Sequence, residues 1–350
     1  MIGCAIAREL AARGVPCTVV EDRGVAGGAT QASAGMLAPY VEAHERGPLL
    51  DLAVRSLALF PEWIAAVRRE ARMDVEFATL GTLEVATTPE RAAALRAASR
   101  EHGEWLDAEA LQRACPSLCR AAAGGRLTPE HGYIVAPQMA NALAQAAEGL
   151  GAAFRAGRVE RITRTASGYR VETTAGAIDA GRVVLAAGAW TNGIQGVRTP
   201  RIRPVRGQIV QLAWPEQPLR SIVWGPRCYV VPRLDQSILV GATMEEAGYD
   251  ERTTAAGVRD LLDAVCELLP VARDASFLHA RAGLRPASPD GLPVLGADPA
   301  QPGIFHASGH YRNGILLAPI TATLLADLIA DGRRDPALDD FSVTRFDPPR

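Results

Sequence analysis

The sequence contains no lysine, so all 37 of its basic residues are arginines. A chain without lysine cannot form a Schiff base with pyridoxal phosphate, hold a nucleotide with a phosphate-loop lysine, or use a lysine as general base. Every fixed cation is therefore a guanidinium, the group that binds carboxylates through two parallel hydrogen bonds.

Net charge and long apolar runs are also scarce. The formal net charge of −2 gives no reason to expect a nucleic acid or a membrane surface as partner. The longest apolar stretch near the end, residues 314–330, carries Asp327 and is too short to span a bilayer. No signal-peptide pattern is present.

Cysteine and histidine are few and scattered. The six cysteines predict small, reduced core residues of a cytoplasmic protein. Cys115 and Cys119 are separated by three residues, but no second pair or nearby histidine completes a metal site. The six histidines show no metal-ligand spacing, so we expect no metal.

The N-terminal residues resemble the second half of a dinucleotide-binding unit. Residues 3–13 have helical apolar spacing, and Gly14 is placed to end the helix. Residues 16–22, PCTVVED, predict a buried strand ending in Glu21 and Asp22, where a Rossmann unit binds ribose hydroxyls. Gly3 can only be the last glycine of the G-x-G-x-x-G fingerprint. We therefore expect the natural protein to have roughly a dozen more residues, forming a strand that ends in two glycines.

Further along, helices and strands alternate. Residues 27–40 form an uncharged loop of small residues, which lets backbone approach a ligand closely. Residues 49–70 and 89–103 predict amphipathic helices, and residues 81–87 predict a strand. Residues 157–178 alternate in short runs separated by turn residues, as an antiparallel meander does. Residues 182–190 predict an apolar strand that stops on small residues.

A hairpin is expected at residues 227–244, with its turn at residues 234–237. If Leu234 pairs with Ser237, Tyr229 lies opposite Ala242. Tyr229 and Met244 are then diagonal neighbours on one face of the hairpin.

The last third of the chain combines a polar loop with a helix. Residues 281–296 are rich in Pro and Gly and predict a rigid loop that carries Arg285. Residues 304–332 predict a strand, a glycine-bearing loop and a helix, with Asn313 as its N-cap.

Six segments of the chain together resemble the D-amino-acid oxidase family of FAD-dependent amine oxidoreductases, and within it the glycine oxidases of thiamine biosynthesis. They are CYVVPR, LVGATM, AGLRPASPDGLPVLG, GHYRNGILLAP, GGATQASAGML and VVLAAGAW. The resemblance runs over nearly the whole chain in matching order. It implies an α/β fold with a Rossmann-like FAD domain of the glutathione-reductase type and an antiparallel-sheet substrate domain, interleaved in sequence. The implied FAD domain comprises residues 1–73, 132–195 and 290–340. The implied substrate domain comprises residues 74–131 and 196–289.

The resemblance also implies a set of residues around FAD. We expect the cofactor to be noncovalent, because no cysteine lies in residues 281–296, beside which related sarcosine oxidases attach it. The last helix, starting near Asn313, would direct its N-terminus at the flavin edge that becomes anionic on reduction. The expected cofactor residues are Gly3, Glu21, Asp22, Thr30, Ala34, Gly35, Met36, Val159, Gly188, His310, Tyr311, Arg312, Asn313, Gly314, Ile315 and Leu316.

On the substrate side, the resemblance implies four residues. Arg285 would clamp the substrate carboxylate in a two-pronged ion pair. Tyr229 would donate its hydroxyl to the same carboxylate, Arg312 would line the site, and Met244 would form an apolar wall. His310 is expected to shape the cofactor loop rather than to act in acid–base chemistry.

The implied activity is oxidative deamination of glycine and other small amines or D-amino acids, with dioxygen as electron acceptor and hydrogen peroxide as product. The imino acid would supply thiazole synthesis for thiamine. We expect a homo-oligomer that binds neither nucleic acid nor membrane. The alternatives are a quinone-linked D-amino-acid dehydrogenase, a tRNA-modifying flavoprotein domain, a sarcosine oxidase-like enzyme and a non-catalytic remnant.

Overall fold

The computed structural model describes residues 1–42 and 46–348, and all six cysteine thiols are free. Its helices are α1 Ile2–Ala12, α2 Pro39–Glu42, α3 Pro48–Ala71, α4 Pro89–Ala98, α5 Ala108–Ala114, α6 Ala136–Gly149, α7 Ala255–Leu268 and α8 Ala318–Ala326. Its strands are β1 Thr18–Glu21, β2 Met36–Leu37, β3 Phe77–Ala78, β4 Thr82–Ala86, β5 Glu104–Asp107, β6 Gly124–Thr128, β7 Gly132–Ile134, β8 Ala153–Ala156, β9 Val159–Thr165, β10 Gly168–Thr173, β11 Gly176–Ala180, β12 Val183–Leu185, β13 Arg203–Ala213, β14 Ile222–Trp224, β15 Tyr229–Pro232, β16 Ser237–Gly241, β17 Ser276–Ala287, β18 Val294–Ala297 and β19 Ile304–Ser308.

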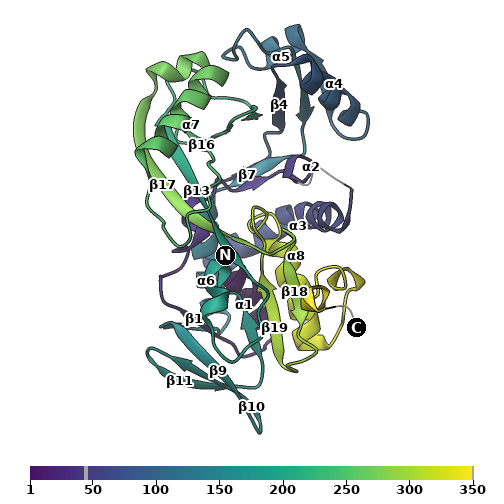
Figure 1. Cartoon of the computed structure of the whole chain (residues 1–350), viewed down its shortest axis with the longest axis vertical. Coiled ribbons are helices and arrows are strands. Elements are labelled where there is room, and N and C mark those ends of the chain that lie inside the picture. The colour runs from purple at the N-terminus through teal and green to yellow at the C-terminus, as the bar shows by residue number, and fades with distance from the viewer. Residues whose placement is uncertain (43–45, 349–350) are drawn as a thin grey trace.

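One large sheet dominates the upper part of the molecule in Figure 1. Its eight strands follow the order β17-β13-β16-β15-β14-β4-β6-β5. All neighbouring strands are antiparallel except β14 and β4, which are parallel. The sheet is therefore mixed, whereas the prediction was a wholly antiparallel sheet. Its hydrophobic core includes the buried side chains of Leu83, Val210, Val240 and Val265.

Helices and smaller sheets form the lower part of Figure 1. There α1 packs against α6 and α8, and α3 packs against the same two helices. Strands β1 and β8 form one parallel pair, while β12 and β19 form another, extended by β18. The predicted meander is confirmed as the antiparallel strands β9, β10 and β11. The α/β fold with two unlike parts is therefore the predicted one.

The predicted helices follow from their apolar spacing. The buried face of α3 includes Leu52, Phe60, Ile64 and Val67, which recur at the helical period. Helix α1 ends as expected, since Gly14 has a φ of +71°, a left-handed conformation that glycine adopts without strain. Helix α4 is shorter than predicted, because residues 104–107 turn back as β5 to pair with β6.

Strand β1 forms where it was predicted, but it is not buried. Thr18 and Glu21 are exposed, and Val19 and Val20 are half-buried. Among the described residues β1 pairs only with β8, so its other edge borders a cavity instead of a neighbouring strand.

The predicted register of the hairpin is wrong by one residue. Tyr229 lies opposite Gly241 rather than Ala242. The loop between Arg233 and Ser237 has three residues, and Gln236 adopts a φ of +63°, as three-residue hairpin loops require at one position. Met244 lies beyond the end of β16, so strand parity does not place it on the same face as Tyr229.

Two further predictions near the C-terminus need correction. Arg285 lies in β17 rather than in a loop, because β17 pairs along its whole length with β13 and sits at the edge of the sheet, where proline is tolerated. Asn313 does not cap α8, which begins at Ala318 after Leu317. Instead Asn313 lies in a turn, where its carbonyl oxygen accepts from the backbone N–H of Leu317 at 2.8 Å.

Within the described residues, no helix combines the length and the hydropathy that a membrane span requires.

Candidate active site

A cavity of about 2050 Å³ lies where the two parts of the molecule meet. It exceeds the roughly 300–1,000 Å³ of ordinary ligand pockets, so an extended ligand together with a smaller one can enter it. Its lining combines the N-terminus of α1, the end of β1, the small-residue loop 26–36, the end of β12 and the strands β15, β16 and β17. Tyr229, Met244, Arg285 and Arg312, which lie far apart in the sequence, all border this cavity.

Arg285 projects from β17 over the backbone of the neighbouring strand β13. Gly207 makes this possible, because a Cβ at that position would overlap the guanidinium. One nitrogen, Nη1, donates to the carbonyl oxygen of Thr243 at 3.0 Å and to that of Arg206 at 3.4 Å. Among the described residues no carboxylate pairs with Arg285 and no acceptor is bonded to its Nε or Nη2. The charge and the fork of two donors are therefore available to a ligand carboxylate.

Tyr229, like Arg285, occupies the space left by a glycine on the neighbouring strand. Its ring lies over Gly241 of β16, where a Cβ would overlap the phenol. The Trp224 ring packs beside it, with centroids 5.3 Å apart. Burial raises the pKa of the Tyr229 hydroxyl, although Arg285 and Arg312 oppose the shift, so the group stays protonated and can donate a hydrogen bond.

Arg312 and Met244 complete this end of the cavity. Arg312 pairs with Glu42, with Nε and Oε2 2.9 Å apart, and its guanidinium lies 6.0 Å from the Trp224 ring centroid. The Met244 side chain is exposed, and its sulfur accepts a hydrogen bond from the Tyr311 hydroxyl at 3.1 Å. Met244 therefore lines the cavity at its exposed rim.

Most of the predicted cofactor residues border the cavity as well. They are Gly3, Glu21, Asp22, Thr30, Ala34, Gly35, Met36, Val159, Gly188, His310, Tyr311, Arg312, Gly314 and Ile315. Asn313 and Leu316 do not: both are buried beside the cavity, and Leu316 packs in the helical core.

The far end of the cavity suits a dinucleotide. Residues 1–4 at the start of α1 border it, and helix N-termini bind phosphate groups through free N–H groups and the helix dipole. Glu21 follows at the end of β1, the position from which an acid binds ribose hydroxyls. Arg23 lies over the Trp190 ring, 4.3 Å from its centroid, and pairs with Glu251 at 2.5 Å. Sequence reasoning overlooked Arg23, Trp190 and Glu251.

The small-residue loop approaches the cavity with its backbone. Gly35 has a φ of +72°, and a Cβ there would overlap the carbonyl oxygen of Ile134. Arg233 donates from Nη2 to the carbonyl oxygen of Ala34 at 2.9 Å and stacks over the Tyr133 ring. Arg233 thus fixes the loop on one side, and the side that borders the cavity remains open to a flat ligand.

His310 is buried, and its Nε2 lies 3.1 Å from the Thr321 hydroxyl. Burial lowers the pKa of His310 to about 3, so the ring is neutral at physiological pH. The contact with Thr321 joins the 310–315 turn to α8.

Comparison with known proteins gives the family. Over residues 1–328 the chain matches the family described as FAD dependent oxidoreductase. It is 36% identical over 359 residues to a glycine oxidase of Geobacillus kaustophilus (strain HTA426), a match that covers 99% of this chain and 94% of that protein. The crystal structure of glycine oxidase from Geobacillus kaustophilus has a TM-score of 0.93 to this structure and covers 99% of this chain and 96% of that chain.

A second relative is longer. The chain is 37% identical over 355 residues to the bifunctional protein ThiO/ThiG of Nostoc sp. (strain PCC 7120). The match covers 99% of this chain and 54% of that protein, so the chain spans about half the length of this relative.

Proposed function

The chain belongs to the FAD dependent oxidoreductase family, and from this premise we propose that it catalyses the oxidative deamination of glycine and other small amines or D-amino acids. For glycine, the substrates are the amino acid, dioxygen and water. The products are glyoxylate, ammonia and hydrogen peroxide. The similarity to the Geobacillus glycine oxidase over 99% of the chain supports glycine as a substrate.

One observation carries the proposal most directly: the guanidinium of Arg285 borders the cavity with its Nε and Nη2 donors turned to no acceptor among the described residues. In this arrangement Arg285 binds the substrate carboxylate through two hydrogen bonds. The protonated hydroxyl of Tyr229 donates a third. Fixing the carboxylate at one end orients the amine and the Cα for reaction, which is the main contribution a protein makes to such chemistry.

FAD, when bound, supplies the acceptor for the hydride from the substrate Cα and passes the electrons to dioxygen. In our proposal the cofactor is noncovalent and occupies the part of the cavity bordered by residues 1–4, Glu21 and the small-residue loop 26–36. Its ribose would face Glu21, its phosphates the start of α1, and its ring system the backbone of Ala34, Gly35 and Met36. The neutral His310 keeps the 310–315 turn in shape beside it.

We place the enzyme in thiamine biosynthesis, where the imino acid would supply thiazole synthesis. The similarity to the ThiO/ThiG protein of Nostoc supports this role. The free cysteines are in keeping with a cytoplasmic location. We also propose the domain division given above, with residues 74–131 and 196–289 as the substrate domain and residues 1–73, 132–195 and 290–340 as the FAD domain. In support, one of the two largest hydrophobic cores draws its residues mainly from the FAD-domain segments, and the other draws them from the substrate-domain segments.

The test is an assay of the protein loaded with FAD for peroxide formation and steady oxygen consumption with glycine, sarcosine and D-alanine. Replacing Arg285 with Ala should lower kcat/KM for glycine about a hundredfold, or about 3 kcal/mol, because a hydrogen-bonded ion pair to the substrate is lost. Amines without a carboxylate should be poor substrates of the parent and change little. An Arg285→Ala enzyme with parent-like kinetics on glycine would contradict the assignment, and electron transfer to quinones without oxygen consumption would indicate a dehydrogenase.

A further inference from the structure

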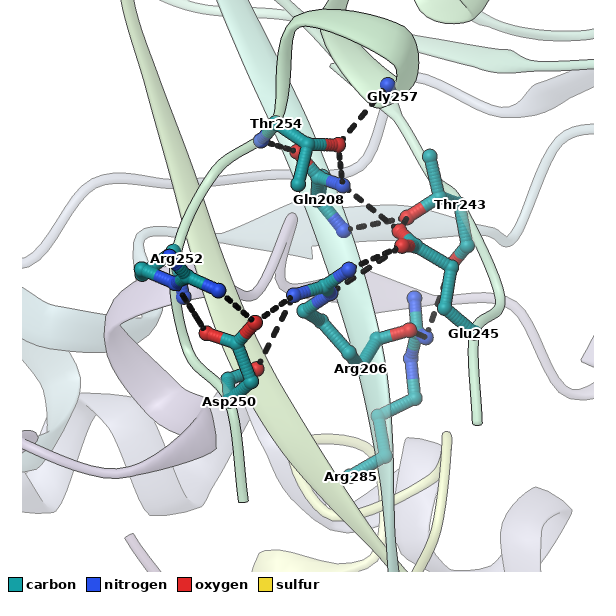
Figure 2. A network of polar contacts seen from close by, with 9 residues as sticks. All are labelled: Arg206, Gln208, Thr243, Glu245, Asp250, Arg252, Thr254, Gly257 and Arg285. Atoms are coloured by element: carbon teal, nitrogen blue, oxygen red, sulfur yellow. Dashed lines mark hydrogen bonds and ion pairs between the residues drawn. The ribbon is translucent and has the colours of Figure 1, made fainter. Parts of the chain in front are cut away.

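Beside Arg285 lies a network of polar side chains, shown in Figure 2, of which Thr243 also borders the cavity. Glu245 is at its centre. Its Oε1 accepts hydrogen bonds from Gln208 Nε2 at 2.7 Å and from the Thr243 hydroxyl at 2.5 Å. Its Oε2 accepts from Arg206 Nη2 at 2.6 Å and Nε at 3.2 Å. Both carboxylate oxygens are therefore fully engaged within the protein.

The network is partly buried and tied to the backbone. Arg206 and Gln208 are 6% and 0% exposed, while the Glu245 side chain is 29% exposed. Burial alone would raise the pKa of Glu245, but hydrogen bonds from Thr243, Arg206 and Gln208 lower it, so the carboxylate is charged at neutral pH. The backbones of Arg206 and Glu245 exchange two hydrogen bonds, of 2.9 and 3.0 Å, and Gln208 N–H donates to the Thr243 hydroxyl at 2.8 Å. The segment that follows β16 is thus fixed to β13.

This fixed pair of segments supplies both carbonyl oxygens that hold Arg285. They belong to Thr243 and Arg206, residues that Glu245 binds directly. Nη1 of Arg285 donates to both, which sets the rotation of the planar guanidinium about its long axis. The direction of the remaining Nε and Nη2 donors follows from that rotation.

We propose that Glu245 is a positioning residue for the Arg285 clamp, acting through Thr243 and Arg206. It does not border the cavity and would not touch the substrate. The inference rests on the proposed function, since it takes the substrate carboxylate as the ligand of Arg285. The inference adds that a substitution in the network weakens binding of the substrate carboxylate and leaves the reaction at the substrate amine unchanged.

The main variant is Glu245→Gln, in the full FAD-loaded enzyme. Arg206 keeps a second acid, since its Nη1 lies 3.0 Å from Asp250 Oδ2, so its buried charge is still compensated. The matched control is Glu246→Gln, which removes the neighbouring carboxylate. Glu246 is exposed, pairs with Arg203 at the surface and takes no part in the network of Figure 2.

Two measurements are made on each protein. The first is calorimetric titration with glycolate, which resembles glycine but has no amine. The second is the pair of kcat and KM for glycine and for glycine ethyl ester, whose carboxylate is masked. We expect Glu245→Gln to raise the glycolate Kd and the glycine KM about tenfold, the cost of misaligning one charged hydrogen bond. Kinetics with the ester should stay within about twofold of the parent, and Glu246→Gln should match the parent throughout.

An unchanged glycolate Kd, or equal losses with glycine and with the ester, would overturn the proposal, because a merely structural role would affect both substrates alike. If Glu245→Gln fails to fold, two other variants take its place. Gln208→Met removes one donor to Glu245, and the pair Arg206→Met with Glu245→Leu removes the central ion pair; neither leaves an unpaired buried charge. They are subject to the same criteria. If the parent oxidises no amine, the proposed function fails, whereas the glycolate titration still decides whether Glu245 orients Arg285.

Discussion

Arg312 and Glu42 form an ion pair at the edge of the cavity, with Nε and Oε2 2.9 Å apart. The Glu42 side chain is 8% exposed, and that of Arg312 is 29% exposed. Arg285, by contrast, has no carboxylate partner among the described residues. Of these two guanidinium groups, both near Tyr229, that of Arg312 is therefore neutralised within the protein and that of Arg285 is left for a ligand.

Because only one of these two cations is free, we expect the site to favour substrates with one carboxylate over those with two. Changing Glu42 to Gln removes the negative charge beside Arg312 and gives the cavity a second cation. We expect kcat/KM for iminodiacetate, a glycine with a second carboxylate, to rise about tenfold relative to that for glycine. Peroxide assays with both substrates measure the ratio. Glu251→Gln is the control, because Glu251 also borders the cavity but pairs with Arg23. A ratio that stays constant would show that Glu42 does not set this preference.

A second prediction concerns the strand position beneath the clamp. In Gly207→Ala the new Cβ would overlap the Arg285 guanidinium, which must then swing away. We expect a loss of about tenfold to a hundredfold in kcat/KM for glycine, with FAD content unchanged. Gly149→Ala serves as the control, since Gly149 ends α6, has open space around it and does not border the cavity. Parent-like kinetics for Gly207→Ala would mean that Arg285 has more room than the structure indicates.

A third prediction concerns the size of the substrate. The exposed Met244 side chain narrows the rim of the cavity, where Tyr311 holds its sulfur. Shortening Met244 to Ala should widen this opening and raise activity on larger D-amino acids relative to glycine. A substrate profile of parent and variant, from glycine and D-alanine to D-phenylalanine, checks this. If the parent oxidises D-phenylalanine as well as glycine, the rim does not select by size.

The fourth prediction concerns stability in acid. His131 is fully buried, and neither ring nitrogen has a hydrogen-bond partner among the described residues. Burial, helped by the charge of Arg126, lowers the pKa of His131 to about 3. The unfolded chain, with a pKa near 6.5, binds a proton that the folded chain excludes, so stability falls as the pH drops below about 6.5.

Replacing His131 with Leu removes this dependence. Between pH 8 and pH 5 the parent should lose about 2 kcal/mol more unfolding free energy than His131→Leu. Urea denaturation of both proteins at the two pH values gives the double difference, in which the change in packing cancels. An equal loss in the two proteins would show that His131 titrates normally in the fold.

Local patterns in the sequence were sufficient to predict α1, α3, α4 and the strands of the meander, whereas α5, α6 and α7 were not predicted. The periodic apolar residues of α3 and the alternating runs of the meander depend on few long-range contacts. The hairpin register was not predictable in the same way. It depends on the left-handed backbone of Gln236, a residue type that seldom adopts this conformation. The strand that contains Arg285 was not predicted because it contains a glycine and a proline, Gly283 and Pro286, which an edge strand tolerates.

The site itself was only partly predictable. The resemblance to a family pointed to Arg285, Tyr229 and Arg312, but not to their neighbours. Glu42 and Glu245 lie in ordinary sequence surroundings, and only the fold brings them to the two arginines. Gly207 and Gly241 did carry a signal, because an isolated glycine inside a strand pattern indicates close approach by another group.

The residues expected to bind the carboxylate and the residue at the rim of the cavity differ in how freely they can be substituted. Arg285 and Tyr229 stand on paired strands over glycines, so their placement is as precise as the sheet itself. The exposed side chain of Met244 lies beyond β16, between Thr243 and Glu245, which fix the segment to β13. Directed evolution toward new amines can therefore randomise Met244 while its two neighbours are kept and the carboxylate anchor is inherited intact.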